Sequence, residues 1–348
     1  MQKSAKKESS LLGLEEDSMA IRYSFFIGKG KPTSSAVYDT YWRFAAQRQD
    51  AFFARLERPS CPPWSVDPVI RDFKFTNAYR AADRVSQYLI RNVIYEGDQS
   101  PEEVFFRIIL FKLFNKIETW EMLVQELGPL TFAGFDWDRG VCVLDDAMRR
   151  NVRVYSAAYI MPSAKSAFGH DRKHSNHLSL LAKMMADKVP LRIQQSRSMK
   201  NAYEILLSYP SIGPFLAYQY VIDINYSTIT SFSEDEFVVA GPGALSGITK
   251  CFTDLRGWGA SDVIRHMTEA QEEEFERLGL KFRDLWSRRL HRIDCQNLFC
   301  EVDKYARVKH PEFCGQGGRT RIKQVFRPTN KPISFWFPPK WQINEKIE

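Results

Sequence analysis

One stretch of the sequence spaces several polar side chains so that they could hold a phosphate or a carboxylate group. The stretch is FKFTNAYRAADRVSQYLI, residues 73–90, and it predicts an amphipathic helix. At 100° per residue its apolar side chains cluster on one side, as in a helix that packs on a core. Guanidinium groups bind phosphate and carboxylate in a forked geometry, although a solvated surface would use the same residues. The polar side carries Asn77, Arg80, Arg84, Gln87 and Arg91, with Asp83 beside them.

A second predicted helix, residues 290–308 (LHRIDCQNLFCEVDKYARV), has a face that bears carboxylates. Paired acids could do general acid/base chemistry, or they could form an internal ion network with the arginines of residues 73–90. Because buried charges need partners, we expect the two helices to meet at a cleft, with at least one contact between an arginine and a carboxylate. The remaining arginine or Asn77 should then face the opening. The polar side of residues 290–308 holds Asp294, Asn297, Glu301, Lys304 and Tyr305.

Two glycine turns each precede a predicted helix. They are YPSIGPFLAYQ, with Gly213, and VVAGPGALSGI, with Gly241 and Gly243. A glycine before a helix lets backbone N–H groups approach a phosphate at the helix N-terminus, although a plain turn between helices would look the same. The sequence GKGKPTS lacks the GxxxxGK[ST] spacing of a phosphate loop. The three histidines of residues 170–177 have no neighbouring cysteine or carboxylate pattern, so no metal site is predicted.

Composition limits the class of protein but not its activity. The 348 residues are 44% hydrophobic, and the net charge of +7 permits a polyanionic partner such as DNA without demonstrating one. The 6 cysteines form no CxxC pair, which is typical of a reducing compartment. Because the sequence has no run of 18 apolar residues and no secretory signal, we expect an intracellular protein, nuclear if the organism is eukaryotic, with no membrane contact. No cofactor and no oligomeric state is indicated.

Helical patterns follow one another along most of the chain, so the sequence predicts a mainly α protein. VRVYSAAYIMP, residues 152–162, is the one region with a strand pattern. We expect a polar arm at 1–35, a first helical lobe at 36–160, a connecting loop at 161–177, a second helical lobe at 178–312 and a C-terminal extension at 313–348. Further helices are expected at residues 34–57, 100–127, 136–151, 178–189, 196–209, 211–224, 243–252 and 268–286.

Five segments of the chain resemble the helical domain of the hydroxymethyluracil DNA kinases. That group includes thymine pyrophosphorylase-like and amino-acid:DNA transferase-like proteins of viral base hypermodification. The resemblance covers roughly residues 37–310. It implies a two-lobed helical fold similar to the helix-hairpin-helix DNA glycosylases, which extrude a base into a pocket between lobes. The segments are YDTYWRFAAQRQDAFF, PPWSVDPVIRDFKFTNAYRAADRVSQYLI, YPSIGPFLAYQ, EDEFVVAGPGALSGI and DCQNLFCEVDKYARV.

Carried over by position, the resemblance also implies functional residues. Arg80 and Arg84 would hold phosphate, and Asn77 would orient the base or a neighbouring carboxylate. The implied acid/base candidates are Asp83, Asp294 and Glu301, and Asp303 belongs to the same motif as Glu301. The implied DNA-binding residues are Tyr41, Trp42, Asn77, Arg80, Arg84, Gly213, Gln219, Gly241, Gly243, Asn297 and Lys304.

The activity that the resemblance implies is group transfer on a flipped 5-hydroxymethyluracil or a related 5-substituted pyrimidine in DNA, onto a hydroxymethyl group that is already activated. The kinase members carry a further P-loop domain, whereas this sequence has no P-loop, so phosphorylation by this chain alone is not expected. The glycosylases carry a catalytic aspartate in a V-D-T context, where this chain reads FVVAGPGA, and Asp223, Asp235 and Glu236 are displaced from that place. A non-catalytic reader of modified DNA and a glycosylase-like excision enzyme are the alternatives, so whether the chain is an enzyme stays open.

Overall fold

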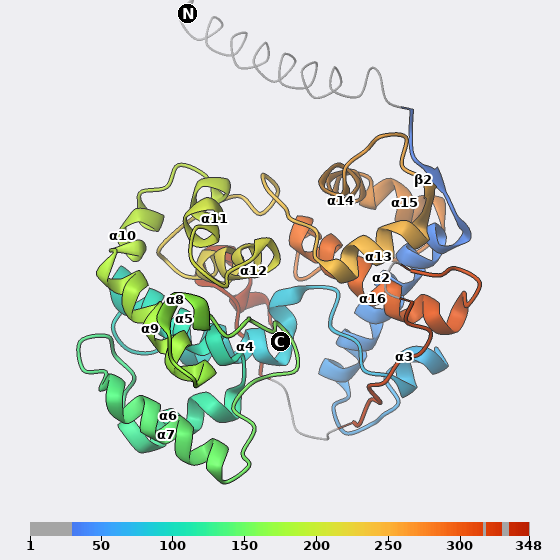
Figure 1. Ribbon diagram of the computed structural model, residues 1–348. Coiled ribbons are helices and arrows are strands. Elements are labelled where there is room, and N and C mark those ends of the chain that lie inside the picture. The colour runs from blue at the N-terminus through green and yellow to red at the C-terminus, as the bar shows by residue number, and fades with distance from the viewer. Residues whose placement is uncertain (1–29, 316–317, 329–333, 348) are drawn as a thin grey trace, which may run out of the picture.

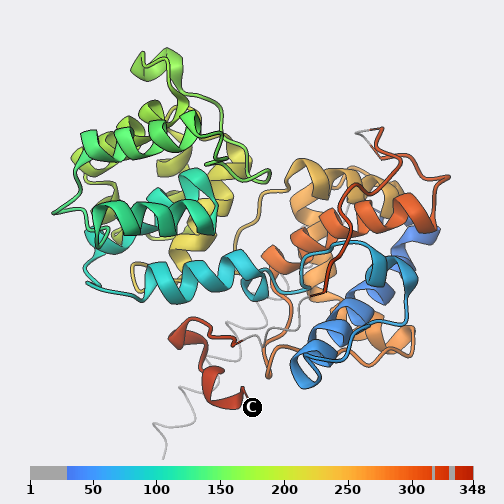
Figure 2. The ribbon, with the colours of Figure 1, turned by 90° about the horizontal axis from the view of Figure 1, so that it is seen from below.

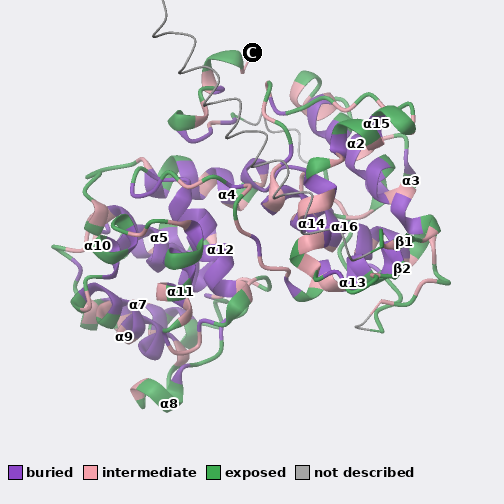
Figure 3. Ribbon diagram, turned by 90° about the horizontal axis from the view of Figure 1, so that it is seen from above, coloured by how far each residue is buried: buried purple, intermediate pink, exposed green. Residues whose placement is uncertain are grey.

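The computed structural model describes residues 30–315, 318–328 and 334–347, and the chain is mainly helical, as the sequence predicts (Figure 1). Its helices form two lobes that lie side by side, each with its buried residues on the inside (Figure 3). The predicted arm at 1–35 lies outside the described residues except for its last six. There, β1 (Thr33–Ser34) pairs antiparallel with β2 (Phe252–Asp254). No helix among the described residues is long and apolar enough to cross a membrane.

The first lobe, called lobe A, combines helices from the two ends of the chain. Helix α16 packs along α13 and against α2, so blue and orange helices lie together in Figure 1. Where α13 crosses α16, a Cβ atom at Gly247 would lie 2.1 Å from the carbonyl oxygen of Phe299, so this crossing requires glycine. The helices of lobe A are α2 (Ala36–Glu57), α3 (Pro68–Asp72), α13 (Pro242–Cys251), α14 (Ala260–Glu269), α15 (Gln271–Arg277) and α16 (Arg292–Lys309).

The second lobe, called lobe B, holds the helices between these two groups. Helix α5 lies at its centre, in contact with α9, α10 and α12. The helices of lobe B are α4 (Arg84–Tyr88), the π-helical η2 (Leu89–Ile94), α5 (Pro101–Phe114), α6 (Ile117–Leu127), α7 (Trp137–Arg149), α8 (Lys165–Phe168), α9 (Lys173–Ala186), α10 (Val189–Gln194), α11 (Met199–Leu207) and α12 (Pro214–Asn225).

The chain passes between the lobes at places that differ from the predicted division. It leaves lobe A at the 3-10 turn η1 (Arg80–Ala82) and returns between α12 and α13. The predicted connecting loop, residues 161–177, instead holds α8 and the start of α9 inside lobe B. Residues 36–160 therefore contribute to both lobes, and so do residues 178–312. Sequence order hides this arrangement because lobe A is built from segments that lie far apart in the chain.

The predicted continuous helix at 73–90 is wrong. Residues 74–79 are irregular, and they are followed by η1, α4 and η2. The N–H groups of Thr76 and Asn77 donate to the carboxylates of Glu301 and Asp83, at 3.0 and 2.8 Å, and so leave the helical pattern. Side-chain acceptors of this kind compete with helix formation. Within residues 73–90, the α-helical spacing begins only at Arg84, the first residue of α4.

Other predicted elements also differ. The helix expected at 268–286 is helical only as the end of α14 and as α15, which ends at Arg277. The helix expected at 100–127 is two helices, α5 and α6, because Asn115 between them has a left-handed backbone with φ of 48°. Asparagine adopts this conformation more readily than most residues. The strand expected at 152–162 is irregular, since its backbone bonds to helices instead of a sheet. Ser156 N–H donates to the carbonyl of Phe114, and the carbonyl of Val154 accepts from the Thr119 hydroxyl.

The C-terminal extension runs across both lobes (Figure 2). In lobe A, the carbonyl of Gln324 accepts the N–H of Lys74 at 2.9 Å. In lobe B, the Gln87 side chain accepts the N–H of Trp336 at 2.8 Å. The extension ends in two 3-10 turns, η3 (Pro339–Trp341) and η4 (Asn344–Lys346). This segment therefore ties the two lobes together.

Candidate functional site

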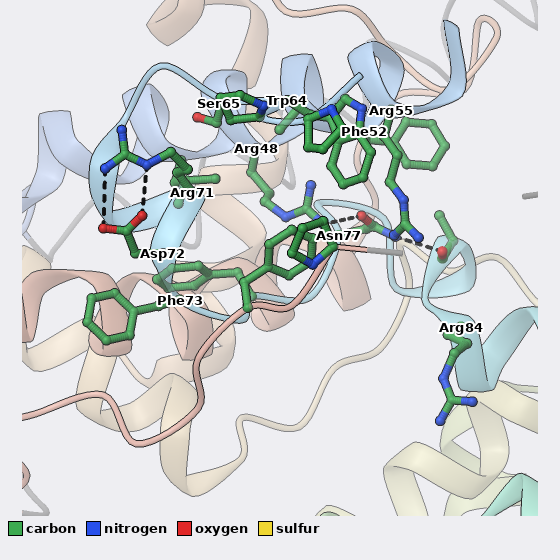
Figure 4. Close-up of a pocket in the computed structure, with 18 of the residues that line it drawn as sticks. Arg48, Phe52, Arg55, Trp64, Ser65, Arg71, Asp72, Phe73, Asn77 and Arg84 are labelled. Atoms are coloured by element: carbon green, nitrogen blue, oxygen red, sulfur yellow. Dashed lines mark hydrogen bonds and ion pairs between the residues drawn. The ribbon is translucent and has the colours of Figure 1, made fainter. Parts of the chain in front are cut away.

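A cavity of about 990 Å³ opens in lobe A next to the junction with lobe B (Figure 4). Its walls come from the second half of α2, the proline-rich loop before α3, α3 with the segment after it, the start of α4, and the C-terminal extension. This volume lies at the upper end of the range for small-molecule and cofactor sites. Among its lining residues are Arg48, Phe52, Arg55, Trp64, Ser65, Arg71, Asp72, Phe73, Phe75, Asn77, Arg84, Gln87, Phe326, Ser334 and Phe335.

The walls of the cavity are aromatic and cationic. Four of the described lining residues are arginines and one is an acid, Asp72, which pairs with Arg71 at 2.7 Å. The guanidinium of Arg55 lies 5.1 Å from the centre of the Trp64 ring. The side chain of Arg84 is 72% exposed, and its nearest acid, Glu118, is 3.9 Å away. Aromatic faces stack on nucleobases and guanidinium groups bind phosphates, so these walls suit a nucleotide.

Arg48 and Asn77 form the polar inner part of the cavity. Arg48 donates from Nε to the Thr76 carbonyl at 2.9 Å and from Nη2 to the Asn77 side-chain oxygen. The Asn77 amide in turn donates to the Ala82 carbonyl at 2.7 Å. Burial lowers the pKa of Arg48 to about 10, against the opposing effect of Asp83 and Glu301. Asn77 thus braces a guanidinium and the turn after it, and its own amide is already occupied.

The three acid/base candidates all hold the backbone of this turn. Asp83 accepts a hydrogen bond from the Asn77 N–H, and Glu301 accepts one from the Thr76 N–H. Glu301 also forms an ion pair with Lys304 at 2.7 Å. Asp294 accepts the N–H groups of Arg80 and His291, at 2.9 and 3.1 Å. Since none of the three lines the cavity formed by the described residues, the contacts make them positioning residues. A catalytic role for them stays a prediction.

Two of these carboxyl groups have raised pKa values. Burial raises the pKa of Asp83 to about 7, and the charge of Glu301 adds to that effect. Burial also raises the pKa of Asp294 to about 6, helped by Glu234. Asp83 lies between Ala82 and Arg84, which both line the cavity. Asp83 is therefore next to the cavity wall in sequence, and its pKa lies near neutral pH.

The predicted meeting of residues 73–90 with α16 occurs, but the arginine pairs elsewhere. Arg80 is 3% exposed, and its Nη1 donates to Asp223 of α12 at 2.7 Å. Its Nε donates to Gln219 at 2.9 Å. Lys112 of α5 reaches the same carboxylate at 3.1 Å. Arg80 is therefore a buried link to lobe B, and it does not hold a phosphate at the surface as predicted.

The charges of this buried cluster depend on one another. Burial lowers the pKa of Lys112 to about 8, although Asp223 acts in the opposite direction. Burial alone would raise the pKa of Asp223, but Arg80 and Lys112 hold it below its ordinary value. Two cations share one carboxylate, so the cluster depends on Asp223.

Several predicted DNA-binding residues are internal. Tyr41 and Trp42 are fully buried, and the Tyr41 hydroxyl donates to the carbonyl of Cys295 at 3.2 Å, so they belong to the core of lobe A and do not contact DNA as predicted. Asn297 donates to the Asn77 carbonyl at 3.0 Å, and Lys304 lies 4.7 Å from the centre of the Phe75 ring. Both therefore support the cavity from behind.

The glycine turns lie away from the cavity. Gly213 and Gly241 are the residues before α12 and α13. A Cβ atom at Gly241 would lie 2.6 Å from the Phe215 ring, so the starts of these two helices are neighbours. A Cβ atom at Gly243 would lie 3.1 Å from Cys300 Sγ, so Gly243 allows close packing against α16. Gln219 is buried on Arg80 and has no surface to offer DNA.

Sequence reasoning missed Arg48, the aromatic walls and the C-terminal extension as parts of the site. One signal was present: Arg48, Phe52 and Arg55 recur at helical spacing in α2, and all three line the cavity. Residues four apart on a helix share a face. The five lining residues after Lys309, namely Val325, Phe326, Pro328, Ser334 and Phe335, had no such signal.

Comparison with known proteins gives one family and one relative. Residues 35–315 match the family described as "5-hmdU DNA kinase, helical domain". The chain is also similar to a 5-hmdU DNA kinase of Bacillus phage SP10, with 26% identity over 293 residues. That alignment covers 78% of this chain and 45% of the relative, so the chain spans less than half of that protein's length. No solved structure matches.

Proposed function

We propose, since this chain belongs to the family described as 5-hmdU DNA kinase, helical domain, that it binds DNA carrying 5-hydroxymethyluracil and takes part in modifying that base. The observation that carries the proposal is the cavity lined by arginines and aromatic rings. A modified base that left the duplex would find ring faces for stacking and guanidinium groups for its flanking phosphates. Arg84, which is exposed and lines the cavity, would make the phosphate contact.

The chemistry that we propose is transfer of a group from an activated donor to the 5-hydroxymethyl oxygen. The hydroxyl loses its proton, a bond forms between its oxygen and the transferred group, and the leaving group of the donor departs with its electron pair. Such a transfer needs a base to take the hydroxyl proton, and a base works best when its pKa is close to the working pH. Asp83, with a pKa of about 7 and both chain neighbours in the cavity wall, is the candidate. Asp294 and Glu301 would position the turn that carries it.

The architecture that we propose is glycosylase-like. The helices α11 and α12, in contact and joined by the turn before Gly213, fit a helix-hairpin-helix whose N–H groups would face DNA phosphates. Base excision is less well supported than group transfer. Asp223, the buried acid of α12, is paired with both Arg80 and Lys112 and is not placed to attack a sugar.

A non-catalytic reader of modified DNA is the second candidate. It is favoured by one observation, that all three acid candidates accept backbone N–H groups of the turn. A reader would use the same cavity for recognition and leave the base unchanged. The two candidates therefore share the binding site and differ in whether a product forms.

The test measures binding and product in parallel. Affinity is compared for matched duplexes that carry thymine or 5-hydroxymethyluracil at one position, and nucleosides are then analysed by mass after incubation with candidate donors. The proposal predicts tighter binding of the modified duplex and a new nucleoside. Unchanged DNA with selective binding would support the reader, and free base would support excision. Equal affinity for both duplexes, with no product, would contradict both candidates.

A matched pair of variants connects this result to the cavity. Arg84→Gln removes an exposed cation from the cavity wall, whereas Arg149→Gln removes one from the end of α7 in lobe B. We expect Arg84→Gln to weaken binding about 5-fold to 160-fold, the range for a charge-assisted phosphate contact of about 1–3 kcal/mol. Arg149→Gln should change the affinity less than 2-fold. Equal effects of the two variants would exclude the cavity as the binding site.

A further inference from the structure

The C-terminal extension has a strongly one-sided charge. Between Phe313 and Asn344 the sequence contains six lysines and arginines and no aspartate or glutamate. Four of the cations, at positions 319, 321, 323 and 327, lie in the described residues 318–328, and all four are exposed. This stretch lies beyond residues 35–315, which match the family. The charge is therefore a property of this chain outside its family domain.

The backbone of this stretch is fixed against lobe A. Lys74 N–H donates to the Gln324 carbonyl and Phe326 N–H donates to the Asp72 carbonyl, both at 2.9 Å. These two bonds surround an antiparallel bridge between Phe73 and Val325. Since the bonds hold the chain extended there, the cations that precede the bridge are anchored on a defined surface of lobe A.

The side chains of this stretch point in two directions. Ile322 is buried, while its neighbours Arg321 and Lys323 are exposed, and Arg319 is exposed two residues earlier. The three cations therefore form an exposed row, and Ile322 is buried within it.

The same stretch also reaches the cavity. Val325, Phe326 and Pro328 line it, directly after the row of cations. Lys74, exposed on the strand-like partner segment, adds a further cation beside the bridge. A strand whose phosphates lay along residues 319–323 would therefore continue to the mouth of the cavity, where its base could enter.

We propose that Arg319, Arg321 and Lys323 form a phosphate track that holds the DNA strand whose base enters the cavity. This inference rests on the proposed function for the identity of the base. The contact with phosphates is independent of sequence and of base modification. The track would supply affinity and register, and the cavity would supply the preference for the modified base.

The test is the salt dependence of DNA binding, measured by fluorescence anisotropy. The variant combines Arg319→Gln, Arg321→Gln and Lys323→Gln, all at exposed positions. The control combines Arg149→Gln, Arg150→Gln and Arg153→Gln, which are also exposed and lie at and just after the C-terminal end of α7 in lobe B. Each phosphate contact contributes about 0.9 to the slope of log affinity against log salt for duplex DNA.

We expect the triple variant to lower the magnitude of that slope by about 2–3. If three contacts are lost, raising the salt from about 50 to about 200 mM should reduce the affinity of the variant about 40-fold less than it reduces the affinity of the wild-type protein. The control should keep the wild-type slope. Arg319→Gln alone, the mildest change, should lower the slope by about 0.9. An unchanged slope in the folded triple variant, or an equal drop in the control, would overturn the track.

The design separates this inference from the proposed function. If the wild-type protein binds modified and unmodified duplexes equally, the proposed function fails, while a lowered slope in the triple variant still supports the track. If the wild-type protein prefers the modified duplex and the triple variant keeps the full slope, the track is wrong and the proposed function stands. The preference itself, as a ratio of affinities, should be the same in the triple variant and the wild-type protein.

Discussion

Replacing Asp83 by asparagine should stabilise the protein while removing its candidate base. The carboxylate of Asp83 accepts the Asn77 N–H at 2.8 Å, and the side-chain oxygen of an asparagine can accept the same bond. What changes is the ionisable group. Burial and Glu301 raise the pKa of Asp83 to about 7 in the folded protein, whereas an unfolded aspartate titrates near 3.9.

Proton binding by Asp83 makes the free energy of unfolding depend on pH. Between about pH 4 and pH 7 the folded protein binds a proton at Asp83 and the unfolded chain does not, so the free energy of unfolding falls as the pH rises through this window. The difference of about 3 pKa units corresponds to at most about 4 kcal/mol. Asp83 keeps partial contact with water, so we expect about 2–4 kcal/mol at pH 8 and a value near zero at pH 4.

The assay is urea unfolding of the wild-type protein and Asp83→Asn at several pH values from 4 to 8. The variant should gain stability relative to wild type as the pH rises, and it should lose group transfer if Asp83 is the base. Asp138→Asn, at an exposed position early in α7, is the control and should differ from wild type by less than about 0.5 kcal/mol throughout. A difference between Asp83→Asn and wild type that does not depend on pH would show that the pKa of Asp83 is not raised in the folded protein.

Two further predictions concern the packing of the lobes and their junction. Gly247→Ala should destabilise lobe A by about 2–3 kcal/mol in urea unfolding, because the added Cβ atom would lie 2.1 Å from the Phe299 carbonyl oxygen. An unchanged free energy of unfolding would mean that α13 and α16 do not cross this closely. In the same assay, Asp223→Asn should lower the free energy of unfolding by about 3–5 kcal/mol and Arg80→Gln by about 2 kcal/mol. Asp223→Asn has the larger effect because it leaves Arg80 and Lys112 without their shared carboxylate. A larger loss for Arg80→Gln would contradict a cluster that depends on Asp223.

Local patterns predicted where several helices begin, because the start of a helix is set by its own sequence. Ser35, for example, caps α2 by accepting the Val37 N–H at 3.0 Å, and Pro101 begins α5. The irregular turn at 74–79 could not be predicted in this way. Its N–H groups are accepted by side chains such as Glu301, which is more than 200 residues away in the sequence. No periodicity within residues 73–90 encodes that partner.

The candidate site could be predicted only in part, because some of its contacts also join segments that lie far apart in the sequence. The sequence indicated that residues 73–90 and α16 meet, because charged groups on both had to find partners. It did not indicate that Arg80 pairs with Asp223, since that acid lies in a largely apolar helix far away in the sequence. Nor did it indicate Phe326 and Phe335, because a wall supplied by the C-terminal extension depends on how that segment crosses lobe A.

Entry of a modified base into the cavity of lobe A can be tested directly by photo-crosslinking. A duplex that carries 5-iodouracil, a 5-substituted uracil, at the target position is irradiated with the protein, and the crosslinked peptides are identified by mass spectrometry. We expect crosslinks to aromatic residues of the cavity, namely Phe52, Trp64, Phe73, Phe326 or Phe335. Crosslinks confined to the turn before α12 or to the surface of lobe B, with the cavity peptides unmodified, would contradict entry of the base into the cavity.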